Sequence, residues 1–513
     1  MKKTVVFLML LTIFSKVLGF ARDISLSYFY GASVISDAYL ISLTIPTVIL
    51  AIIGKGISTG FVPMYTRVES QDGIDRANHY TNNLVNVVLI LCTVILLIGV
   101  LFTEPVVKLF ASGFDGATLE MAVGFTRITL IGVYFTGLVY VFSAFLQIKG
   151  AFLITALVGL PANLILIGSF LLSSKTNIYI LAIGSVVAAA SQFLLLIIFG
   201  YKNKYRYKFR LDMKDENIRK MLVLAFPIIL GSSVAQMNVL VDRTLASQIV
   251  EGGISALNYA NNINLIALGI IVASISSVLF PRISKMAVEN NIKEMKKYLS
   301  ETITTINILV LPITVGYMIF AEPIVQLLFG RGEFSSQAVS LTSSALFFYS
   351  IGLVAKSQRD ILSNVFYSLQ DTKTPMLNAS IALIINIVLN IVLSKYLGIS
   401  GLALASSISL IFCSFLLFVS LRKRIGDFGN NNLFLSFIKV LLASLVMGGL
   451  SKFVFDFLMD KFTLTFSLIV AILLGIIIYF CIISFMRIKE VNMIVLEIKK
   501  KAKKHVKVKE EAS

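Results

Sequence analysis

Charged side chains lie inside segments that are otherwise long enough and apolar enough to cross a membrane. The set comprises Lys16, Arg22, Asp23, Asp37, Lys55, Arg127, Asp242, Arg243, Lys356, Arg359 and Asp360. A charge at the centre of a bilayer costs roughly 2.5–3.5 kcal/mol on insertion scales, and such residues usually face a bundle interior or a water-filled cavity. These residues are therefore the first candidates for function.

The first of these segments holds three charges close together. Lys16 and Asp23 are seven residues apart and share one face of a helix. Arg22 lies about 120° from Lys16 on an ideal helix, although Gly19 between them can bend the helix and change that angle. Two cations in one membrane helix are hard to explain structurally, so we predict a functional role for Arg22.

Other charges in the set have competing explanations. Lys356 and Asp360 are spaced i to i+4, so we expect them to pair and to leave Arg359 unpaired and functional. For Lys55 and Arg127, a structural explanation has the same weight as a functional role, because their long side chains can extend to the membrane interface.

For Asp242, two explanations have the same weight: it is a structural partner of a charge on another helix, or it is a functional group. Asn386 and Asn390 stand one turn apart. For these two amides, hydrogen bonding between helices is a better explanation than contact with a ligand.

The sign of the charges indicates the kind of ligand. A cavity with more cations than anions suits an anionic substrate, whereas an exporter of cations would need the opposite balance. Arginine is suited to phosphate because its planar guanidinium donates two hydrogen bonds at once. Neutral donors are added by Asn258, Asn261, Asn262 and Asn264.

The composition places these charges in a membrane protein. Of the 513 residues, 57% are hydrophobic and only 14% are charged, against roughly 45–50% and about 25% in soluble domains. The net charge of +18 lies mostly in Lys and Arg between the apolar runs, which is typical of membrane-protein loops and argues against nucleic acid as a partner. Cys92, Cys413 and Cys481 each stand alone, and the two histidines lie in a loop and in the tail, so neither a disulfide framework nor a metal site is indicated.

Runs of about 18 or more apolar residues predict transmembrane helices. Fourteen spans are expected, near 4–29, 33–60, 82–103, 121–146, 152–173, 178–200, 219–247, 254–280, 301–320, 338–367, 377–396, 401–421, 434–457 and 463–486. Basic connections follow the even-numbered spans, for example 201–220 and 282–297. The positive-inside rule then predicts that both termini are cytoplasmic.

The two halves of the chain resemble each other. Four matches occur in the same order, at offsets of 218 or 223 residues: Phe61–Pro63 with Leu279–Pro281, Glu104–Phe110 with Glu322–Leu328, Phe145–Gln147 with Ser368–Gln370, and Asn163 with Asn386. Six spans per unit is an even number, so both halves enter the membrane in the same sense, as a parallel repeat. Duplication also occurs outside transporters, but this arrangement is typical of transporters that rock two halves around a central site.

Several motifs resemble the MurJ (MviN) family of lipid II flippases, most closely its Gram-positive branch. The residues concerned are Phe14–Asp23, Ser36–Tyr39, Phe61–Pro63, Leu328–Phe334, which looks like the family's extracellular signature, and Phe366–Pro375, which is similar to its junction between helices ten and eleven. The resemblance implies the superfamily of multidrug, oligosaccharidyl-lipid and polysaccharide exporters. It also implies fourteen helices in two lobes, with a lipid-tail groove formed by the last two.

The implied organisation is all-α. It has an N-terminal lobe at 1–200, a basic cytoplasmic linker at 201–218, a C-terminal lobe at 219–424, a helix pair for the lipid tail at 425–486 and a basic cytoplasmic tail at 487–513. The tail is expected to lie along the anionic inner leaflet or to form a solvated helix.

By the resemblance, Arg22, Asp23 and Asp37 fall on functional positions, and Lys16 stands where the family often has Arg. The chain departs from the family at Leu50, Ala51 and Asn262, where arginines are expected. Lys55, Arg243 and Arg359 are candidate substitutes. The predicted substrate-binding set is therefore Lys16, Arg22, Asp23, Asp37, Lys55, Arg243, Asn262 and Arg359.

The resulting hypothesis is a flippase of the bacterial cytoplasmic membrane that moves undecaprenyl-diphosphate-linked peptidoglycan precursor outward by alternating access. No cofactor or catalytic residue is expected, and no G-x-x-x-x-G-K-[ST] nucleotide motif occurs. The energy source is left open between the membrane potential and an ion, Na+ or H+, coupled through Asp23, Asp37 or Asp242. Expected partners are lipid II, anionic lipids and the cell-wall synthesis machinery.

Three alternatives remain at this point: a flippase for a capsular or teichoic precursor, a cation-coupled multidrug exporter, and a polyprenyl-phosphate glycosyltransferase. The first has nearly the same cavity chemistry. The second would tolerate Arg22→Glu, and the third lacks loops large enough for a sugar-nucleotide site.

Overall fold

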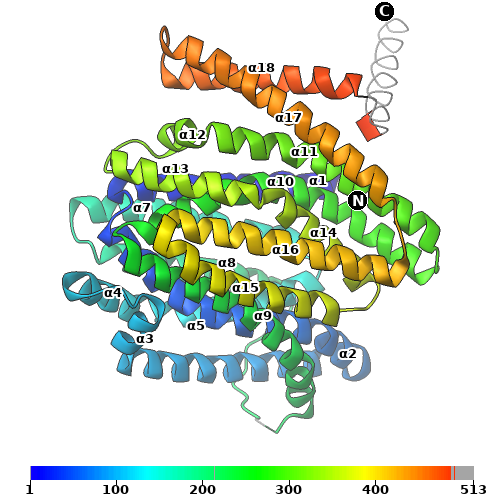
Figure 1. Ribbon diagram of the computed structural model, residues 1–513. Helices are drawn as coiled ribbons and strands as arrows, with labels where there is room; N and C mark the ends of the chain where they lie inside the picture. The colour runs from blue at the N-terminus through cyan, green and yellow to red at the C-terminus, as the bar shows by residue number, and fades with distance from the viewer. Residues whose placement is uncertain (1, 213, 487–489, 492–513) are drawn as a thin grey trace, which may run out of the picture. The chain divides into compact units, whose positions relative to one another are not determined.

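The computed structural model describes residues 2–212, 214–486, 490 and 491. Every regular element of the described chain is a helix, which confirms the predicted all-α fold class (Figure 1). The helices are α1 (Lys2–Tyr30), α2 (Val34–Leu101), α3 (Thr103–Phe110), α4 (Gly116–Thr129), α5 (Gly132–Ile148), α6 (Phe152–Leu157), α7 (Gly159–Lys175), α8 (Ile180–Lys202), α9 (Glu216–Ile249), α10 (Gly253–Val288), α11 (Ile292–Ile319), α12 (Ala321–Leu328), α13 (Ser336–Ile351), α14 (Leu353–Ser368), α15 (Lys373–Leu397), α16 (Ile399–Ile425), α17 (Asn430–Met459) and α18 (Leu464–Phe485).

The chain divides into two compact units. Unit 1 comprises Met1–Tyr259, Phe329–Leu341 and Ile387–Leu402. Unit 2 comprises Ala260–Leu328, Thr342–Asn386 and Ala403–Ser513. The lobe boundaries expected at 200 and 219 stay a prediction, and the basic tail at 487–513 lies outside the described residues apart from 490 and 491.

Within the described residues, nine helices are long and apolar enough to cross a membrane, or eleven if each of two bent pairs forms one span. The 68-residue α2 covers two expected spans, 33–60 and 82–103. Its backbone leaves the helical conformation at Gly73, where φ is 79° and ψ is 175°. Neither α1 nor α9 is among the nine, so the number fourteen stays a prediction.

Local geometry repeats where the sequence repeats. The two short helices α3 and α12 each have eight residues, and each carries Glu-Pro at its second and third positions. The bent pairs are α4 with α5, at 45°, and α13 with α14, at 46°. These elements follow one another in the same order in both halves, which supports the parallel repeat.

The apolar core of unit 1 is formed mainly by α2, α5, α8 and α9. At one end of this core, aromatic rings from distant parts of the chain stack together. The rings of Phe61 and Tyr80 are 5.7 Å apart, and Tyr205 contacts Phe142 at 5.0 Å and Phe145 at 5.7 Å, edge to face. Edge-to-face packing is favourable for aromatic rings, so Tyr205 anchors the segment that follows α8.

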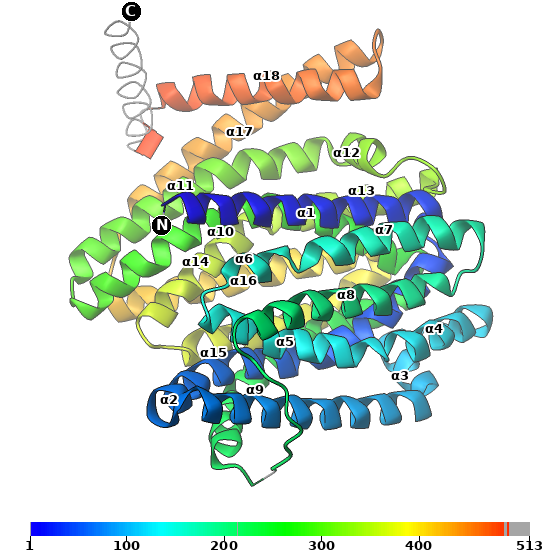
Figure 2. The same cartoon turned by 180° about the vertical axis from the view of Figure 1, so that it is seen from behind.

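Residues 203–212 of that segment are mostly non-helical and cross α2 as a green trace (Figure 2). Four buried asparagines of α2 hold it, and we call Asn78, Asn82, Asn83 and Asn86 the asparagine ladder. Their Nδ2 groups donate to the carbonyl oxygens of Lys204, Arg206, Asp212 and Arg210, at 3.2, 3.0, 2.9 and 2.7 Å respectively. The ladder thus provides the backbone hydrogen bonds that a non-helical segment lacks.

The ladder should contribute measurably to stability, most of all at Asn82. Asn82 also accepts a hydrogen bond from the Tyr205 hydroxyl at 2.6 Å. Asn82→Ala leaves the buried Tyr205 hydroxyl without this partner, at about 1–3 kcal/mol, and also removes the bond to the Arg206 carbonyl, so the melting temperature of the purified protein should fall. Asn78→Ala is the matched control, because Asn78 makes one 3.2 Å bond and its Oδ1 has no partner. Equal melting temperatures for the two variants would contradict this role.

In unit 2, α11, α14, α16 and α17 contribute to a large apolar core. Polar side chains link them inside it: Gln358 donates to Asn307 at 2.8 Å and accepts from Ser414 at 3.5 Å. The last two helices, α17 and α18, pack side by side as the orange pair of Figure 1. This pair occupies the range 425–486 expected to hold the lipid tail.

The junction between α14 and α15 contains the motif Phe366–Pro375. The Asp371 side chain accepts from the backbone N–H and the hydroxyl of Thr374 and forms an ion pair with Arg424 at the end of α16. Burial acts to raise the pKa of Asp371, but these contacts outweigh it and hold the pKa below its usual range. The motif therefore fixes a helix junction.

Candidate functional site

Arg22 and Asp23 lie in α1 and form an ion pair. The Nε and Nη2 atoms of Arg22 donate to Oδ1 of Asp23 at 3.0 and 2.7 Å, and Nη1 donates to Oδ1 of Asn163 in α7 at 3.3 Å. The Arg22 side chain remains 35% exposed, and that of Asp23 11%. Two of the five guanidinium N–H groups are not required by these three bonds, so Arg22 can bind a further acceptor.

Asp37 lies in the first turn of α2 and caps the start of α10. Its Oδ1 accepts from the backbone N–H of Ser255 at 2.7 Å and from the Ser255 hydroxyl at 2.5 Å, and the residue is only 2% exposed. A carboxylate bonded to the N-terminal N–H groups of a helix is stabilised by the helix dipole. In this conformation, then, Asp37 joins two helices.

Arg243 belongs to the same group of residues. Its guanidinium donates to the carbonyl oxygen of Ile254 at 2.9 Å and to Oδ1 of Asn258 at 3.0 Å. It also interacts electrostatically with Asp37. We call Asp37, Arg243, Ser255 and Asn258 the α10 start cluster.

Asp242 accepts a hydrogen bond from Nδ2 of Asn390 in α15 at 2.7 Å. Asn386, one turn earlier, donates to the Ser406 hydroxyl of α16 at 3.4 Å. Hydrogen bonding between helices, expected for both asparagines, is therefore confirmed. Asp242 has an amide as its partner here rather than a charge on another helix.

Three turns meet beside the α10 start cluster through their main chains. Gly31, Gly252 and Gly332 all have positive φ, at 61°, 77° and 64°. A Cβ on Gly332 would lie 2.2 Å from the Tyr28 carbonyl oxygen, and the N–H of Glu333 donates to that oxygen at 3.0 Å. Only glycine fits such positions without strain, so the Gly330–Phe334 stretch is a packing element between turns.

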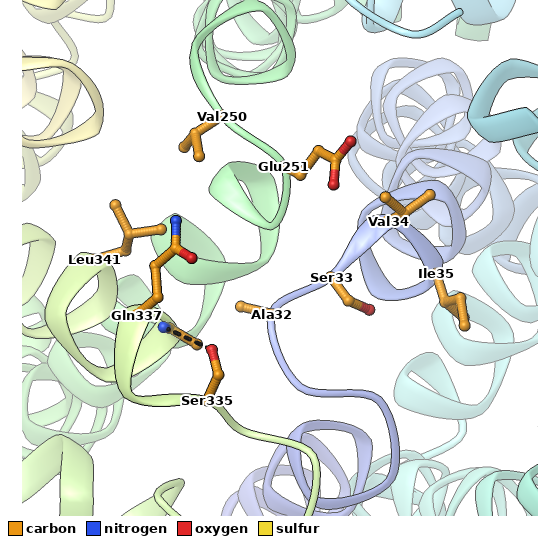
Figure 3. A pocket seen from close by; sticks show the side chains of 10 residues that line it. Ala32, Ser33, Val34, Ile35, Val250, Glu251, Ser335, Gln337 and Leu341 are labelled. Carbon is orange, nitrogen blue, oxygen red and sulfur yellow. Dashed lines mark hydrogen bonds between the residues drawn. The ribbon is translucent and has the colours of Figure 1, made fainter. Parts of the chain in front are cut away.

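A cavity of about 470 Å³ opens at this meeting point (Figure 3). Its walls come from the turn before α2, the turn before α10 and the start of α13. Glu251 is its charged lining residue, and none of the ten lining residues is basic. This lining does not suit a diphosphate, and no residue of the predicted binding set contributes to it.

The remaining predicted residues are Lys16, Lys55, Asn262 and Arg359. Lys16 is exposed on α1, and Lys55 is exposed on α2. Asn262 and Arg359 belong to unit 2. Whether these four residues join Arg22 in one site stays a prediction.

The expected pairing in α14 is wrong. The carboxylate of Asp360 forms its ion pair with Arg359, at 3.7 Å, and not with Lys356. The spacing i to i+4 permits the Lys356 contact, but side-chain direction selects the neighbour. Arg359 is therefore not unpaired, and both partners remain about 40% exposed.

Two partners of the predicted residues were not identified as such from the sequence. The sequence marks Asn163 only as a member of the repeat, yet its side chain contacts Arg22. No sequence pattern marks Ser255 as a partner of Asp37, because a serine at the start of a helix is common and the two residues are 218 positions apart.

Comparison with known proteins identifies the family. The model of the lipid II flippase MurJ family matches residues 26–474. The chain belongs to the MurJ family of lipid II flippases. The resemblance found in the sequence motifs is therefore confirmed, and the expectation of a transporter rather than an enzyme is confirmed with it.

A curated relative and two solved structures illustrate the match. The chain is 30% identical over 412 residues to the probable lipid II flippase MurJ of Vibrio cholerae, covering 78% of each chain. It is 26% identical to a structure titled lipid II flippase MurJ, inward closed conformation, with a TM-score of 0.81, covering 94% of this chain and 98% of that one. A multidrug resistance MATE family transporter of the MOP superfamily shares the fold, with a TM-score of 0.71, 16% identity, and coverage of 81% and 96%.

The family and the many apolar helices make this chain a multi-pass protein of the bacterial cytoplasmic membrane and a lipid II flippase. Its place in the Gram-positive branch stays a prediction.

Proposed function

We propose that the chain moves lipid II from the inner to the outer leaflet by alternating access, with Arg22 as the main ligand of the diphosphate. The observation that carries this proposal is the contact set of Arg22 in α1. Its guanidinium is held in place by Asp23 and Asn163, yet about a third of the side chain is exposed. A positioned guanidinium with free N–H groups suits bidentate binding of a phosphate.

Asp23 has a supporting role in this scheme. It neutralises Arg22 while no substrate is bound, which lowers the cost of a charge inside the membrane. Lys16, exposed two turns earlier on α1, adds the second cation that a diphosphate requires.

The α10 start cluster and the three glycine turns close one end of unit 1. Outward exposure of the head group requires these contacts to separate, so the bonds between Asp37 and Ser255 break during each transport cycle. Because the broken bonds are re-formed when the empty carrier returns, the cluster acts as a reversible gate.

Coupling to Na+, to H+ or to the membrane potential supplies the energy in this proposal. Asp37 and Asp242 have neutral hydrogen-bond donors, Ser255 and Asn390, whereas Asp23 is directly paired with Arg22. A carboxylate without a directly bonded cation is the better acceptor for a proton or a metal ion. We therefore favour Asp37 and Asp242 over Asp23 as coupling residues.

Both termini are cytoplasmic in this proposal, as the basic connections after even-numbered spans indicate. The lipid tail runs along α17 and α18. Anionic lipids and the cell-wall synthesis machinery are further proposed partners.

Complementation tests the function. In cells depleted of their own lipid II flippase, expression of this chain should restore growth and the accessibility of lipid II to a probe added outside the cells. An empty vector is the control. If the chain reaches the membrane but lipid II remains in the inner leaflet, the proposed activity is wrong.

A further inference from the structure

The segment between α8 and α9 presents a basic surface that the transport cycle described above does not use. Residues 201–212 contain five basic residues and one acidic residue. Its exposed members include Lys202, Lys204, Arg206, Lys208 and Phe209, and Arg210 is half-buried. We call these six residues the linker surface.

The linker surface is held in a defined position. The asparagine ladder bonds the backbone on both sides of Lys208, at Arg206 and at Arg210. The hydroxyl of Tyr207 also donates to Asn86 at 2.8 Å, and Arg210 contacts His79 at 3.3 Å. A surface that is already ordered loses little conformational entropy when it binds a partner.

The ladder also sets the depth of this surface along α2. Asn78 and Asn86 are eight residues apart, which is about 12 Å along a helix. The expected span begins at residue 82, so the Lys204 carbonyl is bonded outside the span and the Arg210 carbonyl is bonded one turn inside it. The interfacial layer on each side of a bilayer is roughly 5–8 Å thick, and the linker surface therefore straddles the expected boundary between the head groups and the hydrocarbon core.

The apolar residues of the segment agree with that depth. Phe209 is 78% exposed and Leu211 is 43% exposed. Exposed aromatic and aliphatic side chains between basic residues are unfavourable in water but suit the boundary between head groups and acyl chains.

We propose that the linker surface binds the head groups of anionic phospholipids, with Phe209 inserted at the boundary of the acyl chains. Lys204 and Lys208 supply the charge that selects anionic over zwitterionic lipid, since each Lys or Arg near such a surface strengthens binding. The proposal deepens the proposed function, because it assigns a site to the anionic lipids of the cytoplasmic leaflet. An acidic segment of another protein would also match the charge, but it would not account for the depth or for exposed Phe209.

The absence of tryptophan from the chain allows a local test. Phe209→Trp in the full-length protein introduces a single fluorophore at an exposed position. The variant is reconstituted in vesicles that contain phosphatidylglycerol and phosphatidylcholine, with bromine on the acyl chains of one lipid or the other. We expect brominated phosphatidylglycerol to quench the introduced indole more strongly than brominated phosphatidylcholine at equal mole fractions.

Two double variants in this background complete the test. Lys204→Gln with Lys208→Gln should reduce the preference for phosphatidylglycerol several-fold. Lys293→Gln with Lys297→Gln removes the same charge from exposed positions at the start of α11 and should leave the preference unchanged. Equal quenching by the two lipids overturns the proposal, and so does an unchanged preference after loss of Lys204 and Lys208.

Absence of quenching by either lipid would also overturn the proposal that the linker surface binds lipid, and it would favour a protein partner. The readout does not depend on transport, so a protein that binds lipid but fails in complementation would separate this site from the flippase function.

Discussion

Arg22→Ala should abolish rescue of cells that lack their lipid II flippase, although the protein should still reach the membrane. The substitution removes the guanidinium that we assign to the diphosphate. Hydrogen bonds to charged groups contribute about 1.5–3 kcal/mol each, so the loss of two such bonds predicts at least a 100-fold weaker interaction with the head group. The measurements are growth and the amount of lipid II accessible from outside.

A structural role of Arg22 predicts a different pattern, because Arg22→Ala also leaves Asp23 without its ion-pair partner. The double variant Arg22→Ala with Asp23→Ala removes that unpaired charge. If Arg22 serves only to neutralise Asp23, the double variant should recover activity. If Arg22 binds the diphosphate, the double variant should stay inactive, and Arg22→Lys should retain part of the activity because it keeps the charge without the planar fork.

Gly332→Ala should open the closed end of unit 1. The new Cβ would lie 2.2 Å from the Tyr28 carbonyl oxygen, in a backbone conformation with φ of 64°. The left-handed conformation alone costs a non-glycine residue about 1–2 kcal/mol, a roughly 5- to 30-fold shift in a two-state equilibrium, and the clash adds to it. The segment after α12 must then move away from the end of α1.

A buried cysteine reports this opening. Ala338, in the first turn of α13, is only 2% exposed. In a Cys481→Ser background, which removes an exposed natural thiol, Ala338→Cys should react slowly with a maleimide, and Gly332→Ala should speed the reaction.

Gly116→Ala is the matched control, since Gly116 also has positive φ, at 44°, but nothing lies within 4 Å of its added Cβ. If both glycine substitutions change labelling equally, the close approach at Gly332 is not what holds this end closed.

The class of protein and its local geometry follow from the sequence. The length of an apolar run, the charges within it and the position of a Glu-Pro pair are properties of contiguous residues. For this reason the all-α membrane fold, the family and the repeat of the Glu-Pro segments, which form α3 and α12, could all be recognised before the helices were assembled. Arg22 could be selected in the same way, because a charge in an apolar run is costly wherever the helix packs.

Only the tertiary structure decided which partners these residues have. Spacing allowed Asp360 to pair with Lys356, but side-chain direction selected Arg359. Asp37 contacts Ser255 and Arg22 contacts Asn163 across 218 and 141 residues, and the asparagine ladder meets its linker across more than 120. Such contacts depend on the register and rotation of packed helices, which no local pattern encodes. They turn a list of charged residues into a positioned guanidinium, a carboxylate that joins two helices and an ordered basic surface.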